Sequence, residues 1–143
     1  MTNLPKTMRG VWLTGHGNMD KLKIRYNIPV PIPGPRDVLI RVAAAGVNNT
    51  DINMRLAWYS KQNGSSKDAN WSGQEVKFPR IQGIDVCGHI VAVGKEIDEK
   101  RIGQRVLVEP CIWEVDGRKL GRPCFFGSEI GRASCRERVA SPV

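Results

Sequence analysis

The stretch from Arg80 to Gly94 constrains the fold of this chain more than any other part of its sequence. It reads Arg-Ile-Gln-Gly-Ile-Asp-Val-Cys-Gly-His-Ile-Val-Ala-Val-Gly. The run from His89 to Val93 is rich in β-branched residues and ends at a glycine, which predicts a β-strand. Gly83 and Gly88 allow a close backbone approach or dihedral angles that a side chain would prevent. Taken alone, the spacing fits a β-barrel corner in which the Asp85 carboxylate, which needs a partner among apolar neighbours, ties down a turn.

Short strands separated by turn signals occupy the N-terminal part of the chain. Residues Met8–Thr14 and Lys21–Tyr26 flank a turn at Gly15–Asn18, and this arrangement predicts a hairpin at the edge of a sheet. We expect His16, which is flanked by glycines, to be an exposed loop histidine. The proline-rich stretch Pro29–Pro35 cannot join a central ladder, because proline has no backbone N–H, and is expected to cross the surface.

The same pattern continues toward the C-terminus. Residues Asp37–Ala45 predict a strand at the centre of a sheet, and Gly103–Pro110 predict a turn followed by a strand. Asp116-Gly117 is a plausible hairpin turn. Frequent strands and scarce helix predict a mainly β (α+β) domain, a partly open Greek-key barrel with one or two short helices.

One short helix is expected after the sequence Gly46-Val-Asn-Asn-Thr-Asp51. Asn, Thr and Asp all cap helix N-termini, and Ile52–Ala57 has the composition of a helix. These polar residues are therefore either a cap alone or part of a site. Residues Ser60–Gly73 are predicted to form a long loop. The aromatic residues near its ends, Trp58, Tyr59 and Trp71, could hold the loop down or form an apolar wall for a substrate.

Four segments in the correct order carry a family resemblance that covers roughly residues 8–129. They are Pro31–Val42, Ala45–Asp51, Gly103–Val108, and Gly83-x-Asp85-x-x-Gly88-x-x-x-x-x-Gly94. Together they resemble the N-terminal GroES-like (alcohol dehydrogenase-like) domain of the medium-chain dehydrogenase/reductase superfamily. The subgroup it resembles is the zinc-independent quinone oxidoreductase-like enzymes, which carry Asn where the zinc enzymes carry Cys. The resemblance implies a GroES-like partly open barrel.

The resemblance also implies which residues form the site. Asn48 stands at the position of a zinc-ligating Cys, while Ile84 and Asp85 stand at the positions of the His and Glu of a Gly-His-Glu motif. An amide is a poor zinc ligand and Ile84 has no donor atom, so no catalytic zinc is expected. The resemblance implies that Asn48 contacts the nicotinamide and that Thr50, as a second catalytic residue, orients a substrate carbonyl. For Asp51 it implies a position on the cofactor side, but anchoring the loop is the favoured role of this residue.

The expected substrates are quinones, enones, other carbonyl compounds or alcohols. Trp58, Tyr59 and Asp85 are the residues expected to line their pocket. The cofactor implied for the full-length parent is NADP or NAD. The Gly-x-Gly-x-x-Gly motif by which a Rossmann domain binds this cofactor, at the junction of a strand and a helix, is not found in this chain. We therefore expect residues 1–129 to be a truncated catalytic domain without its Rossmann cofactor domain, inactive alone.

Residues 130–143 are expected to be a non-native or disordered tail. The stretch Ile130–Val139 resembles the in-frame translation of a common sequencing adaptor, and the family resemblance stops after Glu129. The hypothesis is that the native reading frame is lost at this point. The alternative is a natural polar C-terminus.

Composition excludes several other classes of protein. The formal charge of +8 is scattered along the chain, with no basic run interleaved with aromatic residues, which argues against nucleic acid binding. The sequence contains no apolar run long enough to cross a membrane. The N-terminus lacks the apolar block of a secretory signal, so a cytoplasmic location is expected. Four cysteines without Cys-x-x-Cys spacing predict free thiols. The parent is expected to be a homodimer or homotetramer.

Two other functions remain open from the sequence. A stand-alone GroES-like binding or co-chaperone module would need a mobile loop and a ring interface, and it would give the enzyme-like motifs no role. A zinc alcohol dehydrogenase with substituted ligands is the third interpretation. Molecular mass in solution and metal content distinguish these alternatives.

Overall fold

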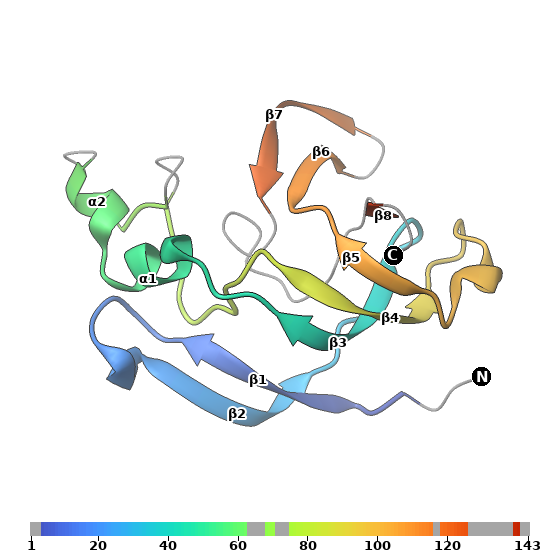
Figure 1. Cartoon of the computed structure of the whole chain (residues 1–143), viewed down its shortest axis with the longest axis horizontal. Helices are drawn as coiled ribbons and strands as arrows, with labels where there is room; N and C mark the ends of the chain where they lie inside the picture. The colour runs from blue at the N-terminus through green and yellow to red at the C-terminus, as the bar shows by residue number, and fades with distance from the viewer. Residues whose placement is uncertain (1–3, 63–67, 71–74, 116–117, 126–138, 141–143) are drawn as a thin grey trace.

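The computed structural model describes residues 4–62, 68–70, 75–115, 118–125 and 139–140. They form three antiparallel sheets and two short helices (Figure 1). Strands outnumber helices, so the prediction of a mainly β, partly open barrel is confirmed. None of the helices described is both long and apolar enough to cross a membrane. The predicted tail and the turn at Asp116-Gly117 lie outside the described residues, apart from a two-residue strand, β8 (Val139–Ala140).

The first sheet is the predicted N-terminal hairpin. Strand β1 (Thr7–Leu13) pairs with β2 (Leu22–Pro29), and the 3₁₀ turn η1 (Met19–Lys21) lies between them. Two backbone hydrogen bonds, from Leu13 N to Arg80 O at 2.8 Å and from Arg80 N to Leu13 O at 3.0 Å, fasten the end of β1 to the segment that enters the second sheet.

The second sheet contains the strand predicted from the His89–Val93 run, and its strand order is β3-β4-β5-β8. Its members are β3 (Val38–Ala45), β4 (Val86–Val93), β5 (Arg105–Val108) and β8; the 3₁₀ turn η2 (Glu99–Arg101) precedes β5. The expectation of a central position for β3 is wrong, because β3 lies at the edge of this sheet and β4 lies inside it. Only the first half of β3 is buried, and its residues from Arg41 onward are exposed.

Gly83 adopts the unusual dihedral angles that the sequence allowed, with a φ of 114°, and Gly88 makes the close backbone approach; Gly94 makes a second close approach that was not predicted. A Cβ atom on Gly88 would overlap the backbone oxygen of Arg41 in β3, where the ladder is irregular between Val42 and Ala44. A Cβ atom on Gly94 would overlap the backbone oxygens of Gly34 and Pro35. The proline-rich connector therefore lies against the end of β4, and only glycine fits at that crossing.

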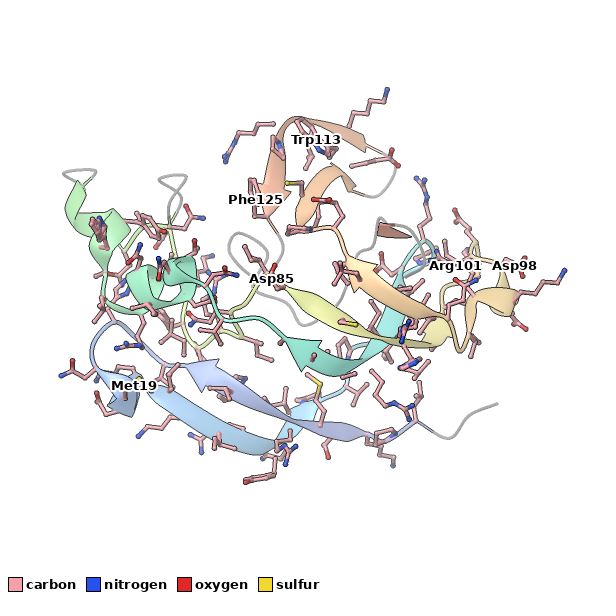
Figure 2. All side chains as sticks on the ribbon, in the orientation of Figure 1. Met19, Asp85, Asp98, Arg101, Trp113 and Phe125 are labelled. Atoms are coloured by element: carbon pink, nitrogen blue, oxygen red, sulfur yellow. The ribbon has the colours of Figure 1, made fainter. Side chains whose placement is uncertain are left out.

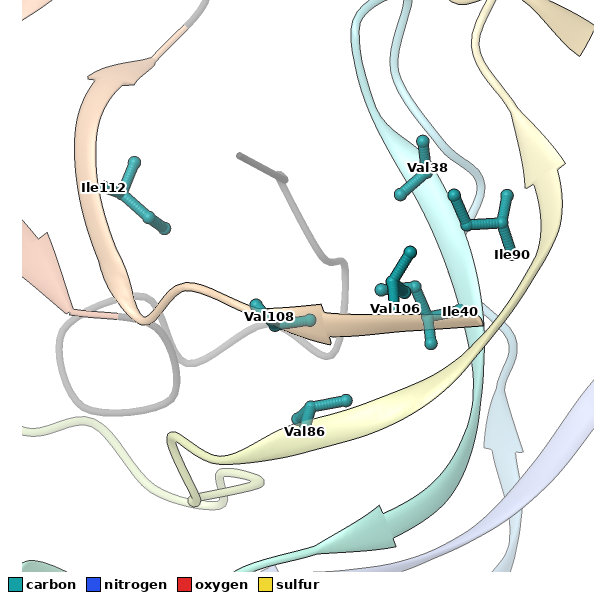
Figure 3. Packing of buried hydrophobic residues seen from close by; sticks show 7 residues of the cluster. All are labelled: Val38, Ile40, Val86, Ile90, Val106, Val108 and Ile112. Atoms are coloured by element: carbon teal, nitrogen blue, oxygen red, sulfur yellow. The ribbon is translucent and has the colours of Figure 1, made fainter. Parts of the chain in front are cut away.

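The main core lies between the second sheet and the third. The third sheet consists of β6 (Cys111–Val115) and β7 (Arg118–Phe125). Figure 3 shows the buried side chains of this core, which come from β3, β4, β5 and β6: Val38, Ile40, Val86, Ile90, Val106, Val108 and Ile112. A smaller cluster of Leu13, Met54 and Val76 packs the helices against the hairpin.

The two helices follow β3. Helix α1 spans Asn49–Arg55 and α2 spans Trp58–Gln62, and between them Ala57 has a positive φ of 58°. The predicted loop from Ser60 to Gly73 therefore begins as a helix. Most of it, including Trp71, lies outside the described residues.

Candidate active site

The end of β3 and the start of β4 bring Asn48 and Asp85 together. The side-chain amide of Asn48 donates a hydrogen bond from Nδ2 to Oδ2 of Asp85. The backbone N–H of Gly46 donates to the backbone oxygen of Asp85 at 3.2 Å. Both side chains are half-buried, and Figure 2 shows Asp85 beside the N-terminal end of α1. The sequence placed these two residues in one site, and the structure joins them directly.

The first turn of α1 extends this contact into a polar network. Asn48 is the N-cap of α1, and its backbone N–H donates to Oδ2 of Asp51 at 2.8 Å. Gln82 donates from Nε2 to the backbone oxygen of Asp51 at 3.3 Å. Four residues from two segments, Asn48, Asp51, Gln82 and Asp85, are thus connected by hydrogen bonds. Asp51 anchors the loop, in agreement with one of its two expected roles.

Gln82 is a member of this network that sequence reasoning missed. Its Oε1 atom is buried and has no hydrogen-bond partner among the described residues. A buried amide oxygen without a donor costs free energy, and native structures contain few of them. The only signal in the sequence was a polar side chain three positions before Asp85 in an apolar stretch.

The remaining predicted site residues lie along the helices. Thr50 is half-buried in the first turn of α1, next to the network. Trp58 and Tyr59 begin α2 and therefore lie at the opposite end of α1 from Asn48, about 10 Å away at 1.5 Å of rise per residue. Trp58 is 44% exposed and Tyr59 is half-buried. The structure thus places a polar network and an aromatic pair at the two ends of one short helix.

Exposed apolar side chains surround this helix pair. Val47 precedes the N-cap and is 82% exposed, and Ile52 and Leu56 follow on α1 at helical spacing. Isolated exposed apolar residues are common, but several beside one polar network form a mixed surface suited to an organic ligand.

The donor set at this site is poor in the ligands that zinc prefers. Ile84 offers no donor atom, the Asn48 amide is a poor zinc ligand, and the carboxylates of Asp51 and Asp85 are the remaining candidates in the network. Among the described residues, no group of three or more His, Cys, Asp or Glu side chains could hold a metal ion. Cys87, Cys111 and Cys124 are free thiols, and Cys135 lies outside the described residues.

Burial shifts the pKa of two side chains in the described part of the chain, Cys111 and Arg80. Burial raises the pKa of the Cys111 thiol, and the neighbouring Glu109 carboxylate raises it further. Burial lowers the pKa of Arg80, which is 5% exposed. Neither side chain belongs to the Asn48–Asp85 network.

The expectation of an exposed His16 is wrong. Its side chain is 15% exposed. Its ring packs edge-to-face on Phe78, with centroids 4.9 Å apart. The flanking glycines signalled the turn correctly, but the partners of the ring come from distant parts of the sequence.

Comparison with known proteins decides the family. Residues 34–142 match the alcohol dehydrogenase GroES-like domain. The chain belongs to this family. The predicted resemblance to the N-terminal domain of the medium-chain dehydrogenase/reductase superfamily is therefore confirmed, and quinone oxidoreductases among its relatives support the subgroup.

Three relatives show how this family domain compares with longer proteins. Quinone oxidoreductase of Lama guanicoe is 33% identical over 101 residues, 71% of this chain and 27% of that protein. A solved structure from Sinorhizobium meliloti 1021, provisionally assigned as an alcohol dehydrogenase, is 42% identical to this chain with a TM-score of 0.78. The matched region covers 90% of this chain and 36% of the chain in that structure. A second solved structure from that organism, provisionally assigned as a zinc-binding dehydrogenase and bound to NADP, is 26% identical with a TM-score of 0.56. The matched region covers 76% of this chain and 26% of the chain in that structure. The chain spans about a quarter to a third of the length of these relatives.

Proposed function

We propose that this GroES-like domain is the substrate-side half of a zinc-independent NAD(P)H-dependent oxidoreductase that reduces quinones, enones or other carbonyl compounds, or oxidises alcohols. The observation that carries the proposal is the direct hydrogen bond between Asn48 and Asp85. These residues stand where the zinc enzymes of the superfamily carry Cys and Glu. The hydrogen bond keeps the amide and the carboxylate in place without a metal ion, which supports a zinc-independent site.

The residues of the network have distinct roles in this proposal. A bound reduced nicotinamide would supply the hydride. A carboxylate only accepts hydrogen bonds, so Asp85 holds the nitrogen end of the Asn48 amide and fixes the orientation of its plane toward the nicotinamide. Asp51 holds the backbone of Asn48 and so secures the loop on the cofactor side. The Thr50 hydroxyl orients the substrate carbonyl by donating a hydrogen bond.

The substrate would extend along α1 toward α2. Trp58 and Tyr59 provide an apolar wall about one helix length from Asn48, and Asp85 closes the polar end. This arrangement favours an apolar substrate with one polar reacting group. We infer that the chain alone binds reduced cofactor weakly and turns over nothing, because it offers contacts only to the nicotinamide end.

The test uses the purified chain and a longer protein that joins this domain to a nucleotide-binding domain. We expect less than stoichiometric zinc in both, no micromolar NADPH binding by the chain alone, and NADPH oxidation with a quinone or enone by the longer protein. In the longer protein, Asn48→Ala should lower kcat/KM about 10- to 100-fold, as the loss of a strong hydrogen bond would. The control is Asn49→Ala, which alters an exposed neighbour.

Two results would count against the proposal. One zinc ion per chain would favour the zinc alcohol dehydrogenase alternative, and a ring of about seven chains in solution, without NADPH oxidation, would favour a co-chaperone. Micromolar NADPH binding by the chain alone would contradict only the claim that it is half a site.

A further inference from the structure

The turn between β1 and η1 is fastened to helix α1 at several points. The backbone N–H of Gly17 donates to the backbone oxygen of Arg55 at 2.8 Å, and Nη1 of Arg55 donates to the backbone oxygen of Gly17 at 2.6 Å. Nδ1 of His16 lies 2.7 Å from the backbone oxygen of Met54, in the last turn of α1. The turn therefore holds the C-terminal end of the helix whose N-terminal end carries Asn48.

The other ring nitrogen of His16 reaches a third segment. Nε2 lies 3.2 Å from Oδ1 of Asp68, and this buried nitrogen forms no well-aligned hydrogen bond among the described residues. The contact is an ion pair when the ring is protonated. Asp68 and Ala69 are held by hydrogen bonds of their own. The backbone N–H of Val76 donates to the backbone oxygen of Asp68 at 2.9 Å. The backbone N–H of Ala69 donates to Oγ of Ser60, in α2, at 2.8 Å. One imidazole ring thus lies between the β1–β2 turn, the end of α1 and the segment bonded to α2.

The chemistry of the two contacts selects one protonation state of the ring. A backbone oxygen and a carboxylate oxygen both accept hydrogen bonds and cannot donate them. A neutral imidazole that donates from Nδ1 to the Met54 oxygen turns a lone pair of Nε2 toward the Asp68 carboxylate, whereas the imidazolium presents a positively charged N–H there. The C-terminal end of a helix also attracts a positive charge.

Other charged groups act on the ring from the elements packed around it. Asp68 attracts the imidazolium, although its side chain is 54% exposed and water weakens the attraction. Arg55 from α1, Lys21 beside Gly17 and the buried Arg80 next to Leu13 are cations that oppose it. The contacts of His16 with Met54 and Asp68 therefore have to outweigh this repulsion.

We propose that His16 is a positioning residue whose imidazolium form clamps the β1–β2 turn, α1 and Asp68 together, so that the placement of the α1–α2 pair depends on pH. When the ring loses a proton, either the hydrogen bond to the Met54 oxygen loses its donor or the contact with Asp68 loses its positive partner. The clamp is then complete while the ring is protonated and incomplete once it is neutral. This inference concerns the architecture of the domain and does not depend on the proposed reaction.

The experiment follows the histidine rings of the wild-type chain by NMR between pH 5 and 8.5. The chain has only two histidines, so His16→Asn and His89→Gln assign the two ring signals. We expect the backbone amide signals of Gly17, Leu56 and Asp68 to move with the His16 titration. They should keep that dependence in His89→Gln and lose it in His16→Asn, which retains a donor near the Nδ1 position. Amide signals that do not follow the His16 ring in the wild type would overturn the proposal.

Stability provides a second readout. When the pH rises from 5.5 to 8, the folding equilibrium constant of the wild type should fall, and this fall should be about three- to tenfold larger than in His16→Asn or His16→Gln. The Gln variant retains a donor near the Nε2 position. Asp68→Asn should reduce the same difference. Equal pH dependence in the wild type and both His16 variants would show that the ring only fills space. Should the variants fail to fold, the wild-type NMR titration still decides.

Discussion

The side-chain amide of Asn48 donates a hydrogen bond to the carboxylate of Asp85, although 37 residues separate them in the sequence. The pair forms because β3 ends where β4 begins, and Gly46 lets the two chain segments come close. Gly46 donates to the Asp85 backbone, and a Cβ atom on it would lie 2.9 Å from Oδ2 and 3.0 Å from Cβ of Asp85. The absent side chain of Gly46 therefore determines where the Asp85 carboxylate lies.

Gly46→Ala is expected to displace the Asp85 carboxylate from Asn48. The added methyl group is too close to two atoms of Asp85, and the side chain must rotate or shift. We expect a loss of about 1 kcal/mol of stability and a change in the Asn48 side-chain amide signals in NMR spectra. Gly121→Ala, within strand β7, is the matched control, because a Cβ atom there meets nothing within 4 Å; it should keep or raise stability and leave the Asn48 signals unchanged. Unaltered Asn48 signals in Gly46→Ala would show that Gly46 does not determine the position of Asp85.

Gln82→Met is expected to keep or raise the stability of the domain. The substitution removes the buried Oε1 that has no partner among the described residues, at the expense of one long hydrogen bond of 3.3 Å to Asp51. Replacing an unsatisfied polar group by an apolar group of similar shape is close to neutral or stabilising, within about 1 kcal/mol. Thermal unfolding at pH 7.5 measures the difference in stability between Gln82→Met and the wild type.

The comparison for this prediction is Gln82→Glu, which introduces a carboxylate into a network that already contains Asp51 and Asp85. Like charges at short range disfavour one another, so this variant should be less stable than the wild type at pH 7.5 and recover at pH 4.5, where carboxyl groups take up protons. A marked loss of stability in Gln82→Met would instead indicate that Gln82 is fully satisfied in solution.

The sequence predicted the parts of the fold that local patterns determine. The β1–β2 hairpin, the strand of the His89–Val93 run and the short helix after Asn48 follow from alternation, β-branched residues and capping side chains. The family resemblance assigned Asn48 and Asp85 to one site, but it did not predict the hydrogen bond between them. Local spacing alone could not have brought them together, because their contact depends on how two strands pair.

The errors share one physical cause, which is that partners distant in the sequence decide burial. His16 was expected to be exposed because glycines flank it, yet Met54 and Asp68 enclose its ring. Strand β3 was expected to be central because the run Asp37–Ala45 is well patterned for a strand, yet only its first three residues, Val38 to Ile40, are buried. Gln82 gave only the weak signal of one polar side chain in an apolar stretch, because its role comes from contact with α1.

Ala57→Gly is expected to stabilise the domain. Ala57 joins α1 to α2 with φ at 58°, in the left-handed region that a Cβ atom disfavours. Glycine adopts this conformation without strain, and the gain is partly offset by the greater freedom of glycine in the unfolded chain. We expect a net gain of about 0.5 to 1 kcal/mol in chemical unfolding. Ala44→Gly, in the extended strand β3, is the control and should lose stability, as a strand-interior glycine does.

Glu109→Gln is expected to make Cys111 more reactive toward alkylation. Burial first, and then the Glu109 carboxylate, raise the pKa of the Cys111 thiol. Removing the negative charge lowers that pKa, so a larger fraction of the thiol is ionised at pH 8, and the thiolate is the form that reacts. Site-resolved mass spectrometry after a short iodoacetamide pulse measures the rate at each cysteine. Cys87 and Cys124 act as internal references, and Glu96→Gln, which alters an exposed carboxylate elsewhere, should leave Cys111 unchanged. Equal labelling of Cys111 in both variants would show that burial alone sets its reactivity.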